Sequence, residues 1–257
     1  MKRIILVLMM ICSLGLPPSA YAVKIIKLWT YYDYPPFITD IAAKRGLTYD
    51  FADFLGKHPK NKGRYQFDVQ ILPRKRIDTY LMEGKQGIVV WTNPLFFDDQ
   101  AKLKYRWTTA LWSDSQDVIS LVEKPVEYSG AASSLFGLRI GGVLGHNYIG
   151  IQKEMDEKLI LRNDVLRDEV NIQHLLHKWI DALLIARSTM NIYEKELRLK
   201  GKIHYSKIPL NRYTRHLLLQ RSLEEDLYVF LQQVIDSGSL PEKKSWQMLL
   251  QKYEIWP

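Results

Sequence analysis

The sequence predicts an α/β fold of two similar lobes, each a mostly parallel sheet flanked by helices. Short strand-like runs alternate with helix-like runs along the chain, an order typical of parallel sheets with helical crossovers. The pattern of the first part recurs in the middle of the chain, which indicates a second unit of similar build. With 257 residues, 47% of them hydrophobic, the chain is long enough for two lobes with cores of their own.

The first 22 residues have the composition of a secretory signal peptide. Lys2 and Arg3 form a basic start, residues 4–16 an apolar stretch, and Ala20 and Ala22 a small-x-small cleavage site. The apolar stretch is short for a membrane span, so an uncleaved anchor is the less favoured alternative. We expect cleavage near Ala22, which leaves 235 of the 257 residues as a mature chain in the periplasm.

Charge and cysteine content exclude several classes of function. The single cysteine, Cys12, lies in the predicted signal, so the mature chain has no disulfide and no thiolate ligand. Loss of Lys2 and Arg3 lowers the net charge from +8 to +6, but the remaining bases are mixed with acids, which argues against nucleic acid. His174 and His177 have no acidic partner that completes a zinc site, so we expect no metal and no cofactor. No later stretch is apolar enough to span a membrane.

The first half of the chain shows the strand–helix order directly. Residues 25–29 form a predicted strand that ends at Tyr34-Pro35-Pro36-Phe37, a rigid turn because each proline fixes φ and lacks a donor. The elements that follow are a helix over 47–55, a strand over 65–72, a helix over 76–82 that ends at Gly84, and a buried strand over 87–91.

The second half repeats this order and then becomes helical. Its elements are a strand over 117–122, a strand over 138–144 before the turn Gly145-His146-Asn147-Tyr148, a helix marked by Ile172, Leu175, Leu176 and Trp179, and a buried strand over 182–185. Two helices are predicted at the end of the chain. The first has a capping box at Ser222 and Glu225, ends at Gly238, and has an apolar face formed by Leu227, Phe230, Leu231 and Val234. The second follows Pro241 and carries Trp246, Leu249, Leu250 and Tyr253.

Together these pieces resemble the family 3 periplasmic solute-binding proteins, which include the amino-acid receptors of bacterial ABC importers. The resemblance covers nearly the whole mature chain, through the signal, the turn at 34–37, the helix at 76–84, the strand and turn at 138–145, and residues 178–183. It implies the type II periplasmic-binding-protein fold, with two crossover strands and a ligand cleft that closes by a hinge motion. By this resemblance lobe 1 is residues 23–116 plus 209–257, and lobe 2 is residues 117–208.

The chain departs from this family at two positions that hold an α-amino acid. The family's receptors have an arginine soon after the third strand, for the ligand carboxylate, whereas residues 92–99 contain none. They have an aspartate after the buried strand of lobe 2, for the ammonium, whereas Ala186-Arg187-Ser188 stands there. We therefore expect a small polar or anionic metabolite rather than a standard α-amino acid.

Candidate ligand contacts in lobe 1 follow the predicted strand ends, which face the cleft in this fold. Tyr31, Tyr34 and Phe37 supply aromatic faces for an apolar or cationic group, or alternatively pack under the turn. Arg74 and Arg76 are candidates for gripping an anion, with a solvent-exposed helix start as the alternative.

Further candidates come from the third strand and from lobe 2. The resemblance places Trp91 and Thr92 where the family hydrogen-bonds its ligand, Thr92 being favoured and a core role being the alternative for Trp91. The glycine turn presents free N–H groups to an anion, and its His146 and Asn147 replace the family's hydroxyl residue. His146 predicts a pH-dependent affinity. Arg187, in place of the family's aspartate, favours an anionic ligand or alternatively points to solvent.

The leading hypothesis is a monomeric, non-catalytic periplasmic receptor that delivers a small-molecule ligand to an ABC permease or a membrane sensor. One alternative is an exported enzyme on the same fold, similar to cyclohexadienyl dehydratases, for which Glu83, Asp98 and Asp114 are loosely placed acids. Another alternative is an interaction-only member that no longer binds a solute.

Overall fold

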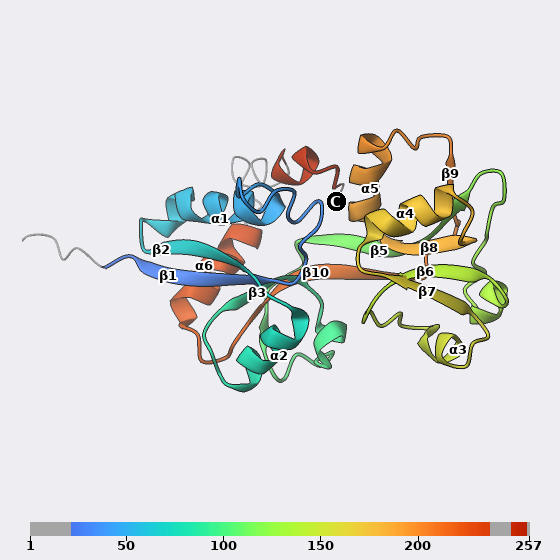
Figure 1. Ribbon diagram of the computed structural model, residues 1–257. Helices are drawn as coiled ribbons and strands as arrows, with labels where there is room; N and C mark the ends of the chain where they lie inside the picture. Colours follow the sequence, from blue (N-terminus) through green and yellow to red (C-terminus); the bar gives the residue numbers. More distant parts are fainter. Residues whose placement is uncertain (1–21, 237–247, 256–257) are drawn as a thin grey trace, which may run out of the picture.

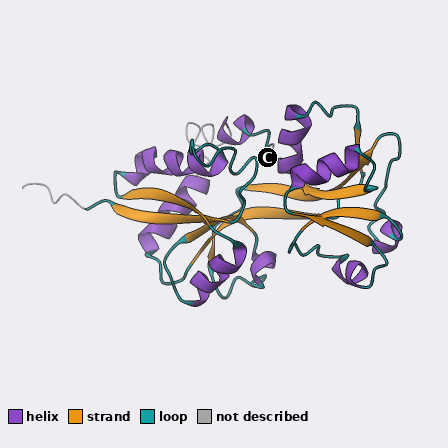
Figure 2. Cartoon of the chain, viewed as in Figure 1, coloured by secondary structure: helices purple, strands orange, loops and turns teal. Residues whose placement is uncertain are grey.

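Two lobes lie side by side and are connected by two long strands (Figure 1). This computed structural model describes residues 22–236 and 248–255. Residues 1–21 of the predicted signal, Gly238, Pro241 and Trp246 lie outside the described residues. Eight of the strands follow one path, in the order β2-β1-β3-β10-β5-β8-β6-β7, with helices above and below it (Figure 2).

Lobe 1 begins with three parallel strands. Strand β1 (Lys24–Thr30) pairs with β2 (Tyr65–Ile71) on one side and β3 (Ile88–Thr92) on the other. Helices α1 (Leu47–Lys57) and α2 (Arg74–Met82) cover opposite faces of these strands (Figure 1). Two 3-10 turns complete this part: η1 (Pro59–Asn61) and η2 (Pro94–Phe97).

Lobe 2 repeats the arrangement with β6 (Arg139–Val143), β7 (Leu161–Val165) and β8 (Ala182–Ala186), in which β6 pairs in parallel with both neighbours. Its helices are η3 (Ala132–Leu135), α3 (Gln152–Asp156), α4 (Asp168–Leu176) and α5 (Arg187–Glu196). Lobe 1 is completed by α6 (Glu225–Asp236) and by a short helical segment at residues 248–252.

Two antiparallel strands, β5 (Trp112–Leu121) and β10 (Asn211–Leu219), pass between the lobes. Residues 112–116 pair with residues 211–215 at the crossing. Beyond it, β5 pairs in lobe 2 with β8 and β9 (Ile203–Tyr205), and β10 pairs in lobe 1 with β3 and β4 (Arg106–Trp107). The predicted pair of crossover strands is therefore present.

Each lobe buries apolar side chains on both faces of its strands. Val118 and Ile119 are neighbours in β5 and join different cores of lobe 2, because successive residues of a strand point to opposite faces. In β10, Leu217 joins the lobe 1 core beneath α1 and α6, while Leu218 joins the core beneath α2. Separate cores in the two lobes leave the crossover strands as their connection.

Several element boundaries differ from the sequence prediction. Helix α2 begins at Arg74 rather than at Arg76. Helix α6 begins at Glu225, which makes Glu224 and not Ser222 its preceding residue, so the capping box was wrong. Helix α4 ends at Leu176, and Trp179 lies beyond it with 59% of its surface exposed.

The predicted lobe boundaries stay a prediction. The boundary after residue 116 falls within β5, and the one after residue 208 precedes β10 by two residues. Among residues 22–236 and 248–255, no helix has the length and apolar character needed to cross a membrane.

Candidate functional site

An aromatic turn follows β1. The Tyr31 hydroxyl lies 2.8 Å from the Tyr32 hydroxyl and 3.3 Å from Thr92 Oγ1, so the ends of β1 and β3 meet here. The Tyr34 ring lies edge-on to Tyr32, with centroids 5.7 Å apart, and its side chain is partly buried. Phe37 is fully buried beneath these rings. Tyr31 and Tyr34 thus remain partly accessible at the end of the strand, whereas Phe37 does not.

Arg74 begins α2 beside this turn. Its Nε donates to Asp78 Oδ1 at 2.8 Å, and its Nη2 donates to the Phe96 carbonyl. Its guanidinium carbon lies 3.8 Å from the ring centroid of Phe97 and 5.4 Å from that of Tyr31. Arg74 is therefore next to the aromatic turn, but its charge already has a carboxylate partner.

A buried ion pair lies at the crossing of β5 and β10. Arg215 Nε donates to Asp114 Oδ2 at 2.8 Å, Nη1 to the Trp91 carbonyl at 2.9 Å, and Nη2 to the Tyr213 hydroxyl at 3.1 Å. Ser188 Oγ, in the first turn of α5, donates to the same carboxylate oxygen at 2.7 Å. The pair therefore connects both crossover strands to β3 and to lobe 2.

Arg187 lies one residue before Ser188 and pairs with Asp117 of β5. The Asp117 carboxylate also accepts a hydrogen bond from Ser115 Oγ at 2.8 Å. The Arg187 guanidinium carbon lies 4.2 Å from the ring centroid of Tyr205. Burial raises the pKa of Asp117, although Arg187 acts against this change. Arg187, which was expected to supply a positive charge for an anionic ligand, is thus neutralised by a carboxylate within lobe 2.

The glycine turn after β6 is held by an arginine that the sequence analysis did not single out. Arg162 Nη2 donates to the carbonyls of Val143, at 3.0 Å, and His146, at 2.9 Å. The His146 ring stacks on Tyr148 with centroids 4.8 Å apart. The His146 side chain is exposed to solvent at this turn.

Asp168, the first residue of α4, is a second group that the sequence analysis missed. It is only 8% exposed, and within the described residues its carboxylate makes no hydrogen bond and no ion pair. Its burial raises its pKa to about 7. Its charge in turn raises the pKa of Tyr34 in lobe 1 and of Tyr148 in lobe 2, after the effect of burial on each. The signal available in the sequence was an acid at a helix start just after a strand.

Several solved structures that share this fold are described as amino-acid-binding proteins. One is an ancestral arginine-binding protein bound to arginine, with 13% identity, a TM-score of 0.66, and coverage of 90% of this chain and 98% of that one. Another is the substrate-binding protein of an amino acid ABC transporter, with 17% identity, a TM-score of 0.64 and coverage of 90% and 99%. A third is an ancestral amino acid-binding protein called a precursor of cyclohexadienyl dehydratase, with 15% identity, a TM-score of 0.64 and coverage of 90% and 95%.

The fold is that of a type II periplasmic binding protein. The identities are low enough that the likeness concerns the fold alone. No protein-family model matches the sequence, and a search of curated proteins finds no match.

Within this periplasmic-binding-protein fold, the predicted site residues divide into three groups. Tyr31, Thr92 and Arg74 lie together at the strand ends of lobe 1, and Tyr34 lies beside Tyr32 in the same aromatic turn. Four candidates of the second group lie apart from these residues. His146 lies in the turn of lobe 2 with Asn147 exposed beside it, Arg187 is paired with Asp117, and Arg76 is exposed on α2 over the Tyr80 ring. The third group is buried in the core.

Two predicted contacts need correction, because their side chains belong to the core. Phe37 and Trp91 are both 0% exposed, and their rings lie 6.2 Å apart in the core of lobe 1. The Trp91 indole donates to Thr48 Oγ1 at 2.9 Å, and only its carbonyl is directed to Arg215. The core role that the sequence left open for Trp91 is the one observed.

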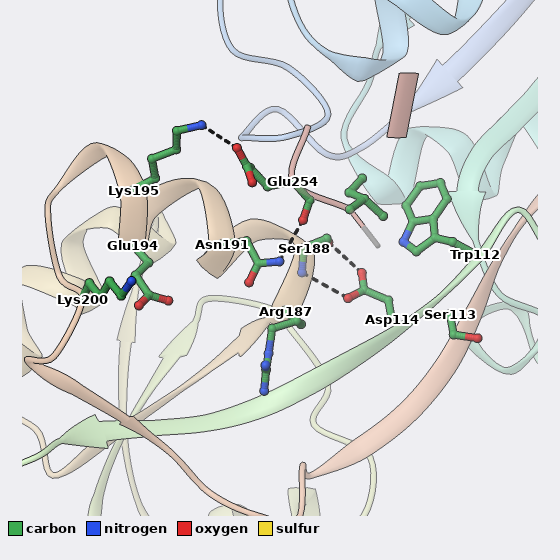
Figure 3. A pocket seen from close by; sticks show the side chains of 11 residues that line it. Trp112, Ser113, Asp114, Arg187, Ser188, Asn191, Glu194, Lys195, Lys200 and Glu254 are labelled. Carbon is green, nitrogen blue, oxygen red and sulfur yellow. Dashed lines mark hydrogen bonds and ion pairs between the residues drawn. The ribbon is translucent and has the colours of Figure 1, made fainter. Parts of the chain in front are cut away.

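A cavity of about 690 Å³ lies between α5, β5 and the C-terminal segment (Figure 3). Trp112, Asp114, Ser188, Asn191 and Glu254 are among the residues that line it. Of the predicted site residues only Arg187 reaches this cavity, and its side chain points away from Glu254 in Figure 3. This cavity is therefore not centred on the strand-end residues.

Among the residues described, no group of three or more histidine, cysteine, aspartate or glutamate side chains is placed to hold a metal ion. Asp99 accepts backbone N–H bonds from Leu103, Lys104 and Tyr105 and so closes its loop.

Proposed function

We propose that this protein is an exported, non-catalytic receptor that closes its two lobes on a small polar solute. The observation that carries the proposal is the arrangement of two lobes with separate cores, which the crossover strands β5 and β10 connect. A solute held between the lobes contacts both of them, and such contacts favour the closed state of a hinged protein.

The groups around this position suit a solute with both flat and polar parts. Tyr31 and Tyr34 offer aromatic faces, and His146 offers ring nitrogens. Thr92 is fully buried, so it acts on this position only through its contact with the Tyr31 hydroxyl. Few apolar side chains accompany them, which disfavours a purely hydrophobic ligand. The anionic metabolite expected from Arg74 and Arg187 remains one candidate.

We propose the periplasm as the location and an ABC transporter or a membrane sensor as the partner. The signal-like first 22 residues support export. One structure with this fold is the substrate-binding protein of an amino acid ABC transporter, which supports the transport role. We propose that the protein acts as a monomer.

The direct test is a binding screen on the purified mature chain, residues 23–257. Thermal shift against a panel of amino acids, polyamines and carboxylic acids finds a stabilising compound, and calorimetry then measures its affinity. We expect that compound to reduce the radius of gyration in small-angle scattering, because closure brings the lobes together. A compound that binds without any such reduction argues against a closing receptor, and binding of no compound favours the interaction-only alternative.

A dehydratase-like enzyme is a second candidate because of one feature. Asp168 is a buried carboxyl whose pKa lies at about 7, and a carboxyl of that pKa can serve as a general acid near neutral pH. The three acids suggested by the sequence are less suited: Asp114 is paired with Arg215, Glu83 with Lys85, and Asp98 follows η2 in a loop. If the purified chain turns over prephenate and Asp168→Asn abolishes this turnover, the enzyme hypothesis is favoured over the receptor hypothesis.

A further inference from the structure

The end of lobe 2 that lies away from lobe 1 is formed by turns between its strands. Strand β5 enters lobe 2 from the crossing and ends here, and β6, β7 and β8 begin here, because β8 runs antiparallel to β5 and β6 runs parallel to β7 and β8 (Figure 1). His146 and Arg187 follow the opposite ends of β6 and β8. This far end is therefore separate from the position at which we place the solute.

Exposed apolar side chains gather at this far end. Between 43% and 59% of the surface is exposed in four of them: Val122, Phe136, Leu159 and Trp179. Backbone hydrogen bonds connect the turns that carry these side chains. The Gly137 N–H donates to the Leu159 carbonyl at 2.8 Å, and the Asp181 N–H donates to the Arg139 carbonyl at 2.8 Å. Single exposed apolar residues are ordinary, whereas several on adjoining turns are typical of an interaction surface.

Trp179 is the largest of these side chains, and the fold directs it outward. Its backbone N–H donates to the His174 carbonyl at 2.9 Å, and its neighbour Ile180 is buried in a core of lobe 2. The ring centroids of His174 and His177 lie 5.0 Å and 5.4 Å from that of Trp179, and 59% of the tryptophan remains exposed. An indole in such a position is typical of proteins that contact the boundary between membrane lipid and water.

Basic residues surround these apolar side chains. The turns of the far end, which are residues 121–124, 136–139, 157–160, 177–181 and 200–202, contain six lysines or arginines and three acids. Asp181 is shared by two of the bases, with Lys124 Nζ at 2.8 Å and Arg139 Nε at 3.1 Å. Lys158 and Lys202 are exposed, and neither pairs with an acid of the described residues. The far end therefore carries an excess of positive charge.

We propose that the far end of lobe 2 is a docking surface for a membrane that contains anionic phospholipids. Trp179 and Phe136 enter the lipid interface, while Lys158 and Lys202 lie at the negatively charged headgroups. The signal-like first 22 residues bring the mature chain to a membrane in the first place. This inference goes beyond the proposed receptor function and requires no solute. Docking raises the local concentration of the protein at a membrane that holds its partner.

The test is cosedimentation of the mature chain with vesicles of phosphatidylcholine, alone or with phosphatidylglycerol, at low ionic strength. We expect the wild type to bind the mixed vesicles and not the neutral ones. Trp179→Ala removes the exposed indole, and Met82→Ala, which removes a side chain of lobe 1 with 79% of its surface exposed, is the matched control. We expect Trp179→Ala to weaken binding by about tenfold or more and Met82→Ala to change it by less than about twofold.

A second pair of variants tests the charges. Lys158→Glu with Lys202→Glu reverses two charges at the far end, whereas Lys44→Glu with Lys62→Glu reverses two exposed charges in lobe 1 and changes the net charge equally. We expect the far-end variant to bind the mixed vesicles about 30-fold or more weakly than the wild type, and the lobe 1 variant to lose less than about threefold.

Three results overturn the inference. The first is a wild type that binds neither kind of vesicle, and the second is a wild type that binds both kinds equally. The third is an equal loss of binding in the far-end variant and its lobe 1 control, which means that the basic chain as a whole, and not this surface, is attracted to the lipid. None of these results affects the receptor function, which the solute screen tests separately.

Discussion

Arg215 and Asp114 form an ion pair in which each side chain is only 2% exposed, with Nη2 and Oδ2 2.8 Å apart. The remaining donors of Arg215 reach the Trp91 carbonyl and the Tyr213 hydroxyl, and Asp114 also accepts from Ser188. Both charges are thus hydrogen-bonded on several sides, which is the condition under which a buried pair is tolerated.

Removal of one partner of this pair is expected to be costly. Arg215→Met leaves Asp114 buried without its cation, and we expect a loss of about 3–5 kcal/mol in the free energy of unfolding. Urea denaturation measures it. The control is Lys57→Met, which breaks an exposed pair with Asp53 and costs at most about 1 kcal/mol. Equal effects of the two substitutions contradict the assigned role of Arg215.

Two glycines of lobe 1 predict opposite responses to alanine. A Cβ at Gly87 meets ring atoms of buried Trp29 at 2.5 Å, whereas a Cβ at Gly56 meets nothing within 4 Å. We expect Gly87→Ala to destabilise by about 1–3 kcal/mol through overpacking. Gly56→Ala, within α1, is expected to stabilise by roughly 0.5–1 kcal/mol, because alanine has the higher helix propensity. Thermal unfolding of both variants against wild type tests the pair, and a shift of the same sign in both is the contrary result.

The fold was accessible from the sequence because its elements carry their own periodicity. Buried strands such as Ile88–Thr92 and Ala182–Ala186 are continuous apolar runs between helical segments. The start of β5 was missed because residues 112–116 are mostly polar. These residues pair with β10 at the crossing between the lobes, where Asp114 and Ser115 are buried with hydrogen-bonding partners, Arg215 and Asp117, in place of apolar neighbours.

The site was only partly predictable, for a physical reason. Strand ends are visible in the sequence, so Tyr31, Tyr34 and Thr92 were found there. Whether a charged side chain is free or paired depends on partners that are distant in the chain. Asp114 and Arg215 are 101 residues apart. The same limit hid Asp168, because only the fold reveals that no cation reaches it.

The C-terminal segment joins the two lobes and predicts an effect on closure. Tyr253 donates to Asp50 Oδ2 of α1 at 2.7 Å, and the Glu254 carbonyl accepts from Asn191 Nδ2 of α5 at 2.8 Å. Lys195 of α5 pairs with the Glu254 carboxylate. This segment therefore acts as a strap between α1 and α5.

Loss of the lobe 2 half of this strap is expected to favour an open state. The double variant Asn191→Ala with Lys195→Ala removes about 1–2 kcal/mol of interlobe interaction. Small-angle scattering without ligand is expected to show a larger radius of gyration than in wild type. Lys200→Ala, which alters the wall of the same cavity, is the matched control. An unchanged radius of gyration in the double variant means that the strap does not influence the opening of the two lobes.

The pH dependence of stability is the clearest consequence of the unpaired Asp168. Its pKa is raised from 3.8 to about 7, so between these values the folded state holds a proton that the unfolded state has released. The stability that comes from this proton is complete below about pH 4 and is lost as the pH rises to about 7. Above that pH the buried carboxylate costs roughly 4 kcal/mol, since one pKa unit corresponds to about 1.4 kcal/mol.

Asp168→Asn removes this cost, because asparagine has nearly the same shape and no charge to bury. We expect the variant to be more stable than wild type at pH 8, and to differ much less from it at pH 4.5. Guanidinium denaturation at both pH values measures the difference, with Glu169→Gln as the control that keeps the wild-type dependence. Other titrating groups, His146 among them, are present in all three proteins and cancel in the comparison. Lower stability of Asp168→Asn at pH 8 means that the carboxylate has a stabilising partner in the folded chain, and the expected cost of burying it is then wrong.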